Sequence, residues 1–147
     1  MYKIIIAIHI ISATIWTGGH LILALGFLPR ALKNRDPNII TNFEATFEKL
    51  GIPALLVQVI TGMSMGFMLI NSWQDWFKWS DSVARNLLIK LILLGLTVVL
   101  AMHARLKIIP NLNKDNLNLL ATHIILVTVV SVLFVITGVG FRFGGLF

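Results

Sequence analysis

Residues 4–29 read IIIAIHIISATIWTGGHLILALGFLP and contain no Asp, Glu, Lys or Arg. Residues 50–74 and 116–141 are also free of these four charged residue types. Each of these stretches is longer than the ~20 residues that a helix needs to cross the hydrocarbon core of a bilayer. The sequence therefore predicts an integral membrane protein.

Four predicted spans account for nearly all of the chain. They cover residues 4–28, 50–70, 86–108 and 117–139. Backbone groups cannot stay unpaired in lipid, and the alternating pattern of a membrane β-strand is absent, so we expect the spans to be helices. The predicted fold is all-α, a single transmembrane domain over residues 1–147 built as an up-down-up-down four-helix bundle. Lys90 lies in the third span, close enough to its start for the side chain to reach the interface.

The composition agrees with this class and excludes several functions. Only 12% of the 147 residues are charged, about half of the ~25% found in soluble domains. The absence of cysteine excludes disulfides, Fe–S clusters and CxxC redox motifs. No nucleotide-binding motif is present, and no carboxylate lies in a predicted span. We assign the net charge of +6 to residues that flank the spans and meet anionic lipid, not to nucleic-acid binding.

The distribution of basic residues predicts the orientation. Seven lie in the loop after the first span, at the end of the third span or in the loop that follows it, namely Arg30, Lys33, Arg35, Lys49, Arg105, Lys107 and Lys114. The opposite side has Lys3, Lys78, Arg85 and Arg142, with Lys90 partly inside the third span. The positive-inside rule then places the two basic loops in the cytoplasm and both termini outside a bacterial-type inner membrane. Because Lys3 is the only basic residue before the first span, we expect that span to be retained and not cleaved as a signal peptide.

Two segments beside the spans carry further patterns. Residues 71–79, NSWQDWFKW, hold three tryptophans and predict a short interfacial helix that anchors the outer surface. Residues 43–50 have apolar side chains at helical spacing and predict an amphipathic start to the second span. Met63, Met65 and Met68 do not share a helix face, and we interpret them as packing and lipid-contact residues.

All four histidines, His9, His20, His103 and His123, lie inside predicted spans. An ionisable side chain within a membrane is a functional-site hypothesis by default, because placing it in lipid is costly. The first and third spans run in the same direction and the fourth returns, so His20, His103 and His123 are expected in the cytoplasmic half. Three imidazoles from three helices at one depth form a ligand set for a metal.

Two cofactors fit such a set. Haem b takes two axial imidazoles from facing helices, and the preferred pair is His20 with His103 or His123. Arg30 and Arg105 are candidates to pair with its propionates. The alternative is a copper ion bound by the three histidines. The glycines Gly18, Gly19, Gly62, Gly66 and Gly95 would clear space for a macrocycle, although close helix packing is the commoner use of such residues.

A second polar site is predicted near the outer ends of the helices, where His9, Lys90 and Arg142 lie at similar depth. It would take an anionic ligand, a quinone or the edge of a second haem. The simpler alternative is that the two cations reach the outer headgroups and that His9 hydrogen-bonds a neighbouring carbonyl or Ser12. The GxxxG pattern in the second span allows a homodimer without requiring one.

Two segments carry a family resemblance: HIISATIWTGGHLILALGFLPRAL, which begins at His9, and ARNLLIKLILLGLTVVLAMHARLKIIPNL, which begins at Ala84. The spacing from His9 to Trp16 and the following Gly-Gly resembles the copper-resistance D (CopD-type) membrane domain, and Lys90 matches a lysine of that group. The resemblance implies copper binding during transport or resistance.

The same segments also resemble the HemJ-type protoporphyrinogen oxidase, a four-helix membrane protein associated with haem b. The matching positions are His9, Trp16, Leu28-Pro29-Arg30, Lys90 and His103. This resemblance implies an oxidoreductase that acts on a porphyrinogen. His20 and His123 have no expected counterpart in that group.

The sequence-based prediction is therefore a haem b protein that transfers electrons in the membrane, with a quinone or another redox protein as partner. A copper-handling protein of the CopD type is the alternative, and a HemJ-like oxidase is a further one. A structural membrane subunit with hydrogen-bonded histidines is the fourth.

Overall fold

The computed structural model describes residues 1–70 and 72–141. This part of the chain is helical apart from short turns, and it contains no β-strand. Four helical stretches are long and apolar enough to span a membrane, namely Tyr2–Asn34, Asn38–Leu69, Ser82–Asn111 and Leu117–Gly140. The prediction of an all-α protein with four transmembrane helices is confirmed.

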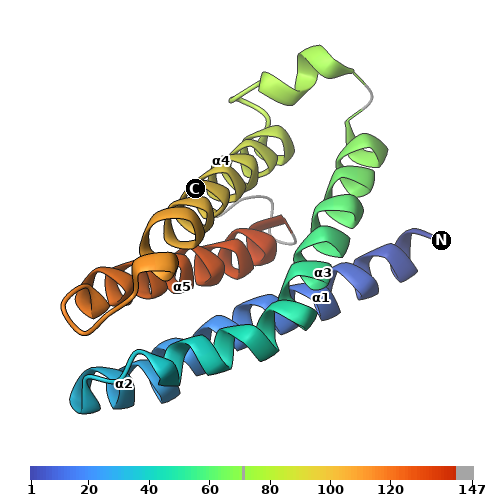
Figure 1. Ribbon diagram of the computed structural model, residues 1–147. Coiled ribbons are helices and arrows are strands. Elements are labelled where there is room, and N and C mark those ends of the chain that lie inside the picture. The colour runs from blue at the N-terminus through green and yellow to red at the C-terminus, as the bar shows by residue number, and fades with distance from the viewer. Residues whose placement is uncertain (71, 142–147) are drawn as a thin grey trace.

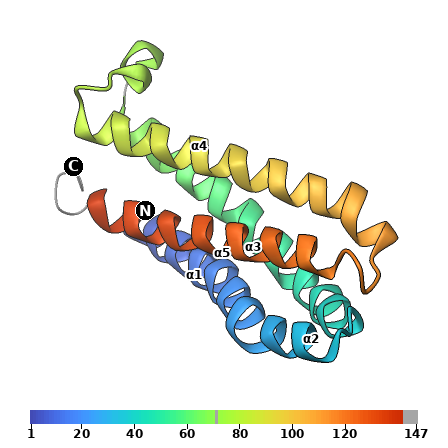
Figure 2. The same cartoon turned by 90° about the vertical axis from the view of Figure 1, so that its left-hand side faces the viewer.

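The helices form two antiparallel pairs, α1 with α3 and α4 with α5, and α5 also packs along α1 (Figures 1 and 2). The first stretch consists of α1 (Tyr2–Ile22), the π-helical turn η1 (Leu23–Phe27) and α2 (Leu28–Asn34). Then follow α3 (Asn38–Leu69) and the 3-10 helix η2 (Trp73–Phe77). The third stretch consists of α4 (Ser82–His103), the π-helical turn η3 (Ala104–Ile108) and the 3-10 turn η4 (Ile109–Asn111), and α5 covers Leu117–Gly140.

Prolines modify three of these four stretches. A proline has no backbone N–H, and its ring clashes with the carbonyl four residues earlier. The π-helical turns η1 and η3 each end two residues before a proline, Pro29 and Pro110, so the helix widens where the regular hydrogen bond cannot form. Pro53 lies inside α3, and Figure 1 shows that this helix changes direction along its length.

The second span begins at Asn38, well before the predicted residue 50, because the amphipathic run over 43–50 continues into it as one helix. Phe47 from this run packs against α1. A Cβ atom added to Gly19 would lie 2.0 Å from the Phe47 ring, and one added to Gly51 would lie 2.8 Å from it. Gly51 therefore leaves room for the Phe47 ring within α3, and Gly19 lets that ring pack closely against α1, the commoner use of small residues in membrane helices.

The third span also begins earlier than predicted, at Ser82 instead of Asn86. The reason is an N-cap: the carboxylate of Asp81 accepts hydrogen bonds from the backbone N–H groups of Val83 at 2.8 Å and Ala84 at 2.9 Å.

The aromatic segment between α3 and α4 forms the short helix that its pattern predicts, but its tryptophans differ in burial. Trp73 and Trp79 expose 68% and 60% of their surface, whereas Trp76 exposes 4%. The Trp76 ring lies against Gly66 and Leu87. The prediction that the whole segment acts as a surface anchor is therefore wrong for Trp76, which belongs to the core between α3 and α4.

Two apolar clusters hold the opposite ends of the bundle. The cluster beside α2 consists of Leu23, Leu28, Ala31, Ile40, Ile108, Leu120, Ala121 and Ile124. The cluster near the start of α4 consists of Ile70, Trp76, Ala84 and Leu87. Between the two clusters, the Thr17 hydroxyl of α1 donates to the Ser131 carbonyl of α5 at 3.3 Å, an interhelical hydrogen bond of the kind that joins helices in lipid.

Gly19→Ala should lower the stability of the solubilised protein by about 1–3 kcal/mol, because its Cβ would overlap the Phe47 ring. Gly18→Ala is the matched control: a Cβ there has nothing within 4 Å, and the gain in helix propensity is the same at both positions. The measurement is the apparent Tm in detergent. Equal Tm values for the two variants would contradict the packing of Phe47 against α1.

Candidate metal pair and membrane cavity

His103, at the end of α4, and His123, in α5, form a pair. His103 Nδ1 lies 2.8 Å from His123 Nε2, and the two rings are stacked with centroids 4.9 Å apart and planes 23° from parallel. The short connection between α4 and α5 brings the two side chains together, as their positions on either side of the loop predict.

Hydrogen bonding assigns the protons of this pair. His123 Nδ1 lies 2.9 Å from the carbonyl oxygen of Leu119, which can only accept, so His123 Nδ1 carries the proton. His123 Nε2 then accepts from His103 Nδ1–H, and His103 Nε2 keeps a free lone pair. Moving the His103 proton from Nδ1 to Nε2 turns both facing nitrogens into acceptors. In that state two imidazoles can hold one metal ion.

His20 belongs to a different interface. Its Nδ1 donates to the Trp16 carbonyl at 2.9 Å, and its ring lies 4.4 Å from the Trp16 ring and 5.6 Å from the Phe47 ring. These contacts lie between α1 and α3, whereas His103 and His123 face each other between α4 and α5. Over residues 1–70 and 72–141, no group of three His, Asp or Glu side chains could hold one metal ion. The structure therefore brings together two of the three predicted ligands.

The facing nitrogens of His103 and His123 are 2.8 Å apart. Two imidazoles that ligate one metal ion from opposite sides keep their nitrogens about 4 Å apart, twice the ~2 Å length of a metal–imidazole bond. The two rings would therefore have to separate by about 1 Å to take a metal ion between them. Of the two predicted propionate partners, Arg105 forms an ion pair with Glu48, and Arg30 is exposed on α2.

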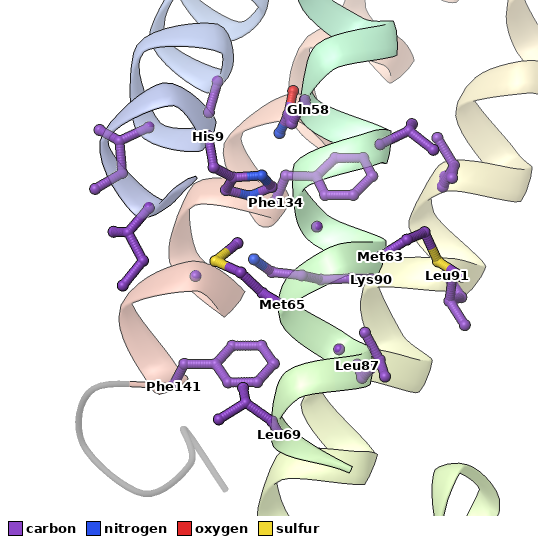
Figure 3. Close-up of a pocket in the computed structure, with 18 of the residues that line it drawn as sticks. His9, Gln58, Met63, Met65, Leu69, Leu87, Lys90, Leu91, Phe134 and Phe141 are labelled. Carbon is purple, nitrogen blue, oxygen red and sulfur yellow. The ribbon is translucent and has the colours of Figure 1, made fainter. Parts of the chain in front are cut away.

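A cavity of about 640 Å³ lies near the other end of the bundle, lined by residues of α1, α3, α4 and α5. His9 and Lys90 point into it from α1 and α4 (Figure 3). Most of the remaining wall is apolar, and Met63 and Met65 form part of it. The sequence pattern assigns these two methionines to packing and lipid contact, because nothing local to α3 shows that a cavity lies beside them.

Thr61 of α3 orients His9. The Thr61 hydroxyl donates its proton to the Val57 carbonyl at 2.7 Å, so its oxygen accepts from His9 Nδ1–H at 2.9 Å. His9 Nε2 is therefore left unprotonated, with its lone pair free. Gly62 leaves the space for the ring, since a Cβ there would lie 3.2 Å from His9 Cε1. The partners of His9 thus lie on another helix: the Thr61 hydroxyl and the backbone of Gln58, both in α3, and not the predicted Ser12.

Lys90 supplies the positive charge of the cavity. Its Nζ lies 5.2 Å from the centre of the Phe141 ring, within cation–π range. In the described part of the chain no carboxylate forms an ion pair with it. Gln58 adds a buried amide, and its Oε1 has no hydrogen-bond partner among the described residues. Arg142, the third residue predicted for this site, lies outside the described residues.

The fold and these side chains define a multi-pass membrane protein with polar sites built from intramembrane histidines. A family model described as Copper resistance protein D (CopD) matches residues 42–141, which is more than half of the chain. The chain belongs to the CopD family, as its motifs predict. The matched region contains Lys90, His103 and His123, whereas α1, with His9 and His20, precedes it. Comparison with curated proteins and with solved structures found no match.

Thr61→Val should release His9 from its fixed tautomer, because the change removes the acceptor of Nδ1–H and keeps the volume. In nitrogen NMR spectra of histidine-labelled protein, we expect the Nδ1 atoms of His9, His20 and His123 to carry a proton. The variant should change the His9 signals alone. Thr46→Val is the control, because that hydroxyl bonds only within its own helix. Unchanged His9 signals in Thr61→Val would argue against the assignment.

Proposed function

We propose that this protein handles copper in the membrane, with the copper ion as its cargo. The observation that carries the proposal is the His103–His123 pair, whose facing nitrogens lie 2.8 Å apart in a chain of the CopD family. Imidazole is a good ligand for copper. The ion would replace the hydrogen bond between the rings once the His103 proton has moved to Nε2. The Leu119 carbonyl would continue to orient His123 through Nδ1–H, as partners of metal-bound histidines commonly do.

The position of the pair suits an ion that is exchanged. His103 is exposed, His123 is half-buried, and both lie at the end of the bundle where α4 turns into α5. We expect an ion to reach the pair from the aqueous side, because the pair lies near the connection between α4 and α5. Protons compete with metal for imidazole nitrogen, and we therefore expect copper to be released in acid.

His103→Ala and His123→Ala should each weaken copper binding by roughly tenfold or more, since losing even a supporting partner of a metal ligand has an effect of that size. The measurement is copper bound per chain in detergent, titrated against a chelator. His20→Ala is the control, because His20 lies in the α1–α3 interface. Equal copper affinity in all three variants would remove the pair as the site.

Haem b, the cofactor predicted from the sequence, is tested on the same sample by visible spectra of the oxidised and the dithionite-reduced protein. A Soret band and a sharp reduced α-band that vanish in His20→Ala would favour haem, and with it electron transfer or a HemJ-like activity. A colourless protein that holds stoichiometric copper would support the copper proposal.

We infer from the basic loops that both termini face the outside of a bacterial-type inner membrane. The chain has no cysteine, so labelling of a single introduced cysteine shows on which side of the membrane that residue lies. Ser80→Cys, in the exposed turn before α4, should react with a membrane-impermeant maleimide in intact cells, and Lys33→Cys, exposed on α2, only after permeabilisation. The reverse labelling pattern would show that both termini face the cytoplasm.

A further inference from the structure

The polar groups of the cavity have no part in copper handling by the His103–His123 pair. Lys90 brings a positive charge that no described carboxylate neutralises, and His9 brings a free lone pair at Nε2. Gln58 brings a buried amide whose oxygen has no described partner. Polar groups without hydrogen-bond partners around an apolar space raise the free energy of the folded protein. A ligand that forms hydrogen bonds with them would remove that penalty.

The cavity is accessible from the lipid. Four residues of its wall also expose about half of their surface: Ile10 with 55%, Val139 with 49%, Leu69 with 47% and Val135 with 44%. Its volume of about 640 Å³ lies within the ~300–1,000 Å³ typical of small-molecule and cofactor sites. A ligand that enters through this wall dissolves in the bilayer and is mostly apolar.

Lys90 and His9 require different hydrogen-bonding groups on that ligand. The Lys90 ammonium can only donate, so it needs an acceptor oxygen, and binds an electron-rich one best. His9 Nε2 can only accept, so it needs a donor. A fatty-acid carboxylate meets Lys90 but offers His9 no proton. A quinol meets both, because it carries hydroxyl groups at opposite edges of a flat apolar ring. Phe134 and Phe141 supply aromatic wall for such a ring.

We propose that this cavity binds a membrane quinol. One hydroxyl donates to His9 Nε2, and the opposite oxygen accepts from Lys90 Nζ. Thr61 holds the His9 ring in the tautomer that accepts, and the missing side chain of Gly62 lets the ring lie there. The site is separate from the histidine pair, so it does not depend on copper binding.

The test uses the whole protein in nanodiscs and tritium-labelled decylubiquinol under argon, with empty nanodiscs as blank. Wild-type protein should bind the quinol saturably. Lys90→Met should weaken binding roughly 10- to 100-fold, the effect of losing a charge-assisted hydrogen bond, and Lys90→Arg should restore part of it. Lys107→Met is the matched control, because it removes the same charge from an exposed position in η3.

A second variant tests the volume of the site without touching either polar group. A Cβ on Gly138 would lie 3.4 Å from Lys90 Nζ, so the longer side chain of Gly138→Leu extends into the ligand space and should abolish binding. The apparent Tm in detergent shows that each variant is folded.

Three results would overturn the proposal. One is equal quinol affinity in wild type, Lys90→Met and Gly138→Leu. Another is oleate binding that is tighter than quinol binding and insensitive to His9→Phe, which would assign the cavity to an anionic lipid. The third is a co-purified haem whose spectrum is lost in His9→Ala.

Discussion

The hydrocarbon of the bilayer offers no hydrogen bond to a peptide group, and the architecture follows from that constraint. Every backbone N–H and C=O in a span must find its partner within the protein, so the described spans are helices. The helices accommodate their prolines by local changes of geometry: π-helical turns precede Pro29 and Pro110, and α3, which contains Pro53, bends along its length. The rest of the bundle is arranged around helices shaped in this way.

The same constraint acts on the histidines. Each of His9, His20 and His123 has an acceptor for its Nδ1 proton: a hydroxyl on another helix for His9, and a carbonyl one turn earlier for the other two. Pairing at Nδ1 satisfies one of the two ring nitrogens, which lowers the free-energy cost of placing an imidazole in lipid, and leaves Nε2 as an acceptor. The chemistry open to each ring then depends on the surroundings of its Nε2 atom. The Nε2 atom of His123 faces a second imidazole, that of His103, and the His9 ring lines a cavity.

The two candidate sites lie at opposite ends of the bundle and differ in their surroundings. The histidine pair is next to the connection between α4 and α5. The cavity is at the end that holds the start of α1 and the end of α5, and its wall is mostly apolar (Figure 3). Phe47, packed against Gly19 and Gly51, joins α1 to α3 in the half that contains His20, and its ring lies 5.6 Å from the His20 ring.

The sequence by itself determined the class of protein and the four spans, because hydropathy and charge act locally along the chain, and its motifs indicated the CopD family that the family model then matched. It also placed His103 next to His123, since a short connection leaves two helices few ways to pair. It did not determine how each helix is rotated about its axis. That rotation turned His20 toward Phe47, Trp76 into the core and Met65 toward His9 and Lys90, and it supplied Thr61 as the partner of His9. Only the tertiary structure could decide these contacts, because they join residues far apart in sequence through side-chain packing that no single helix encodes.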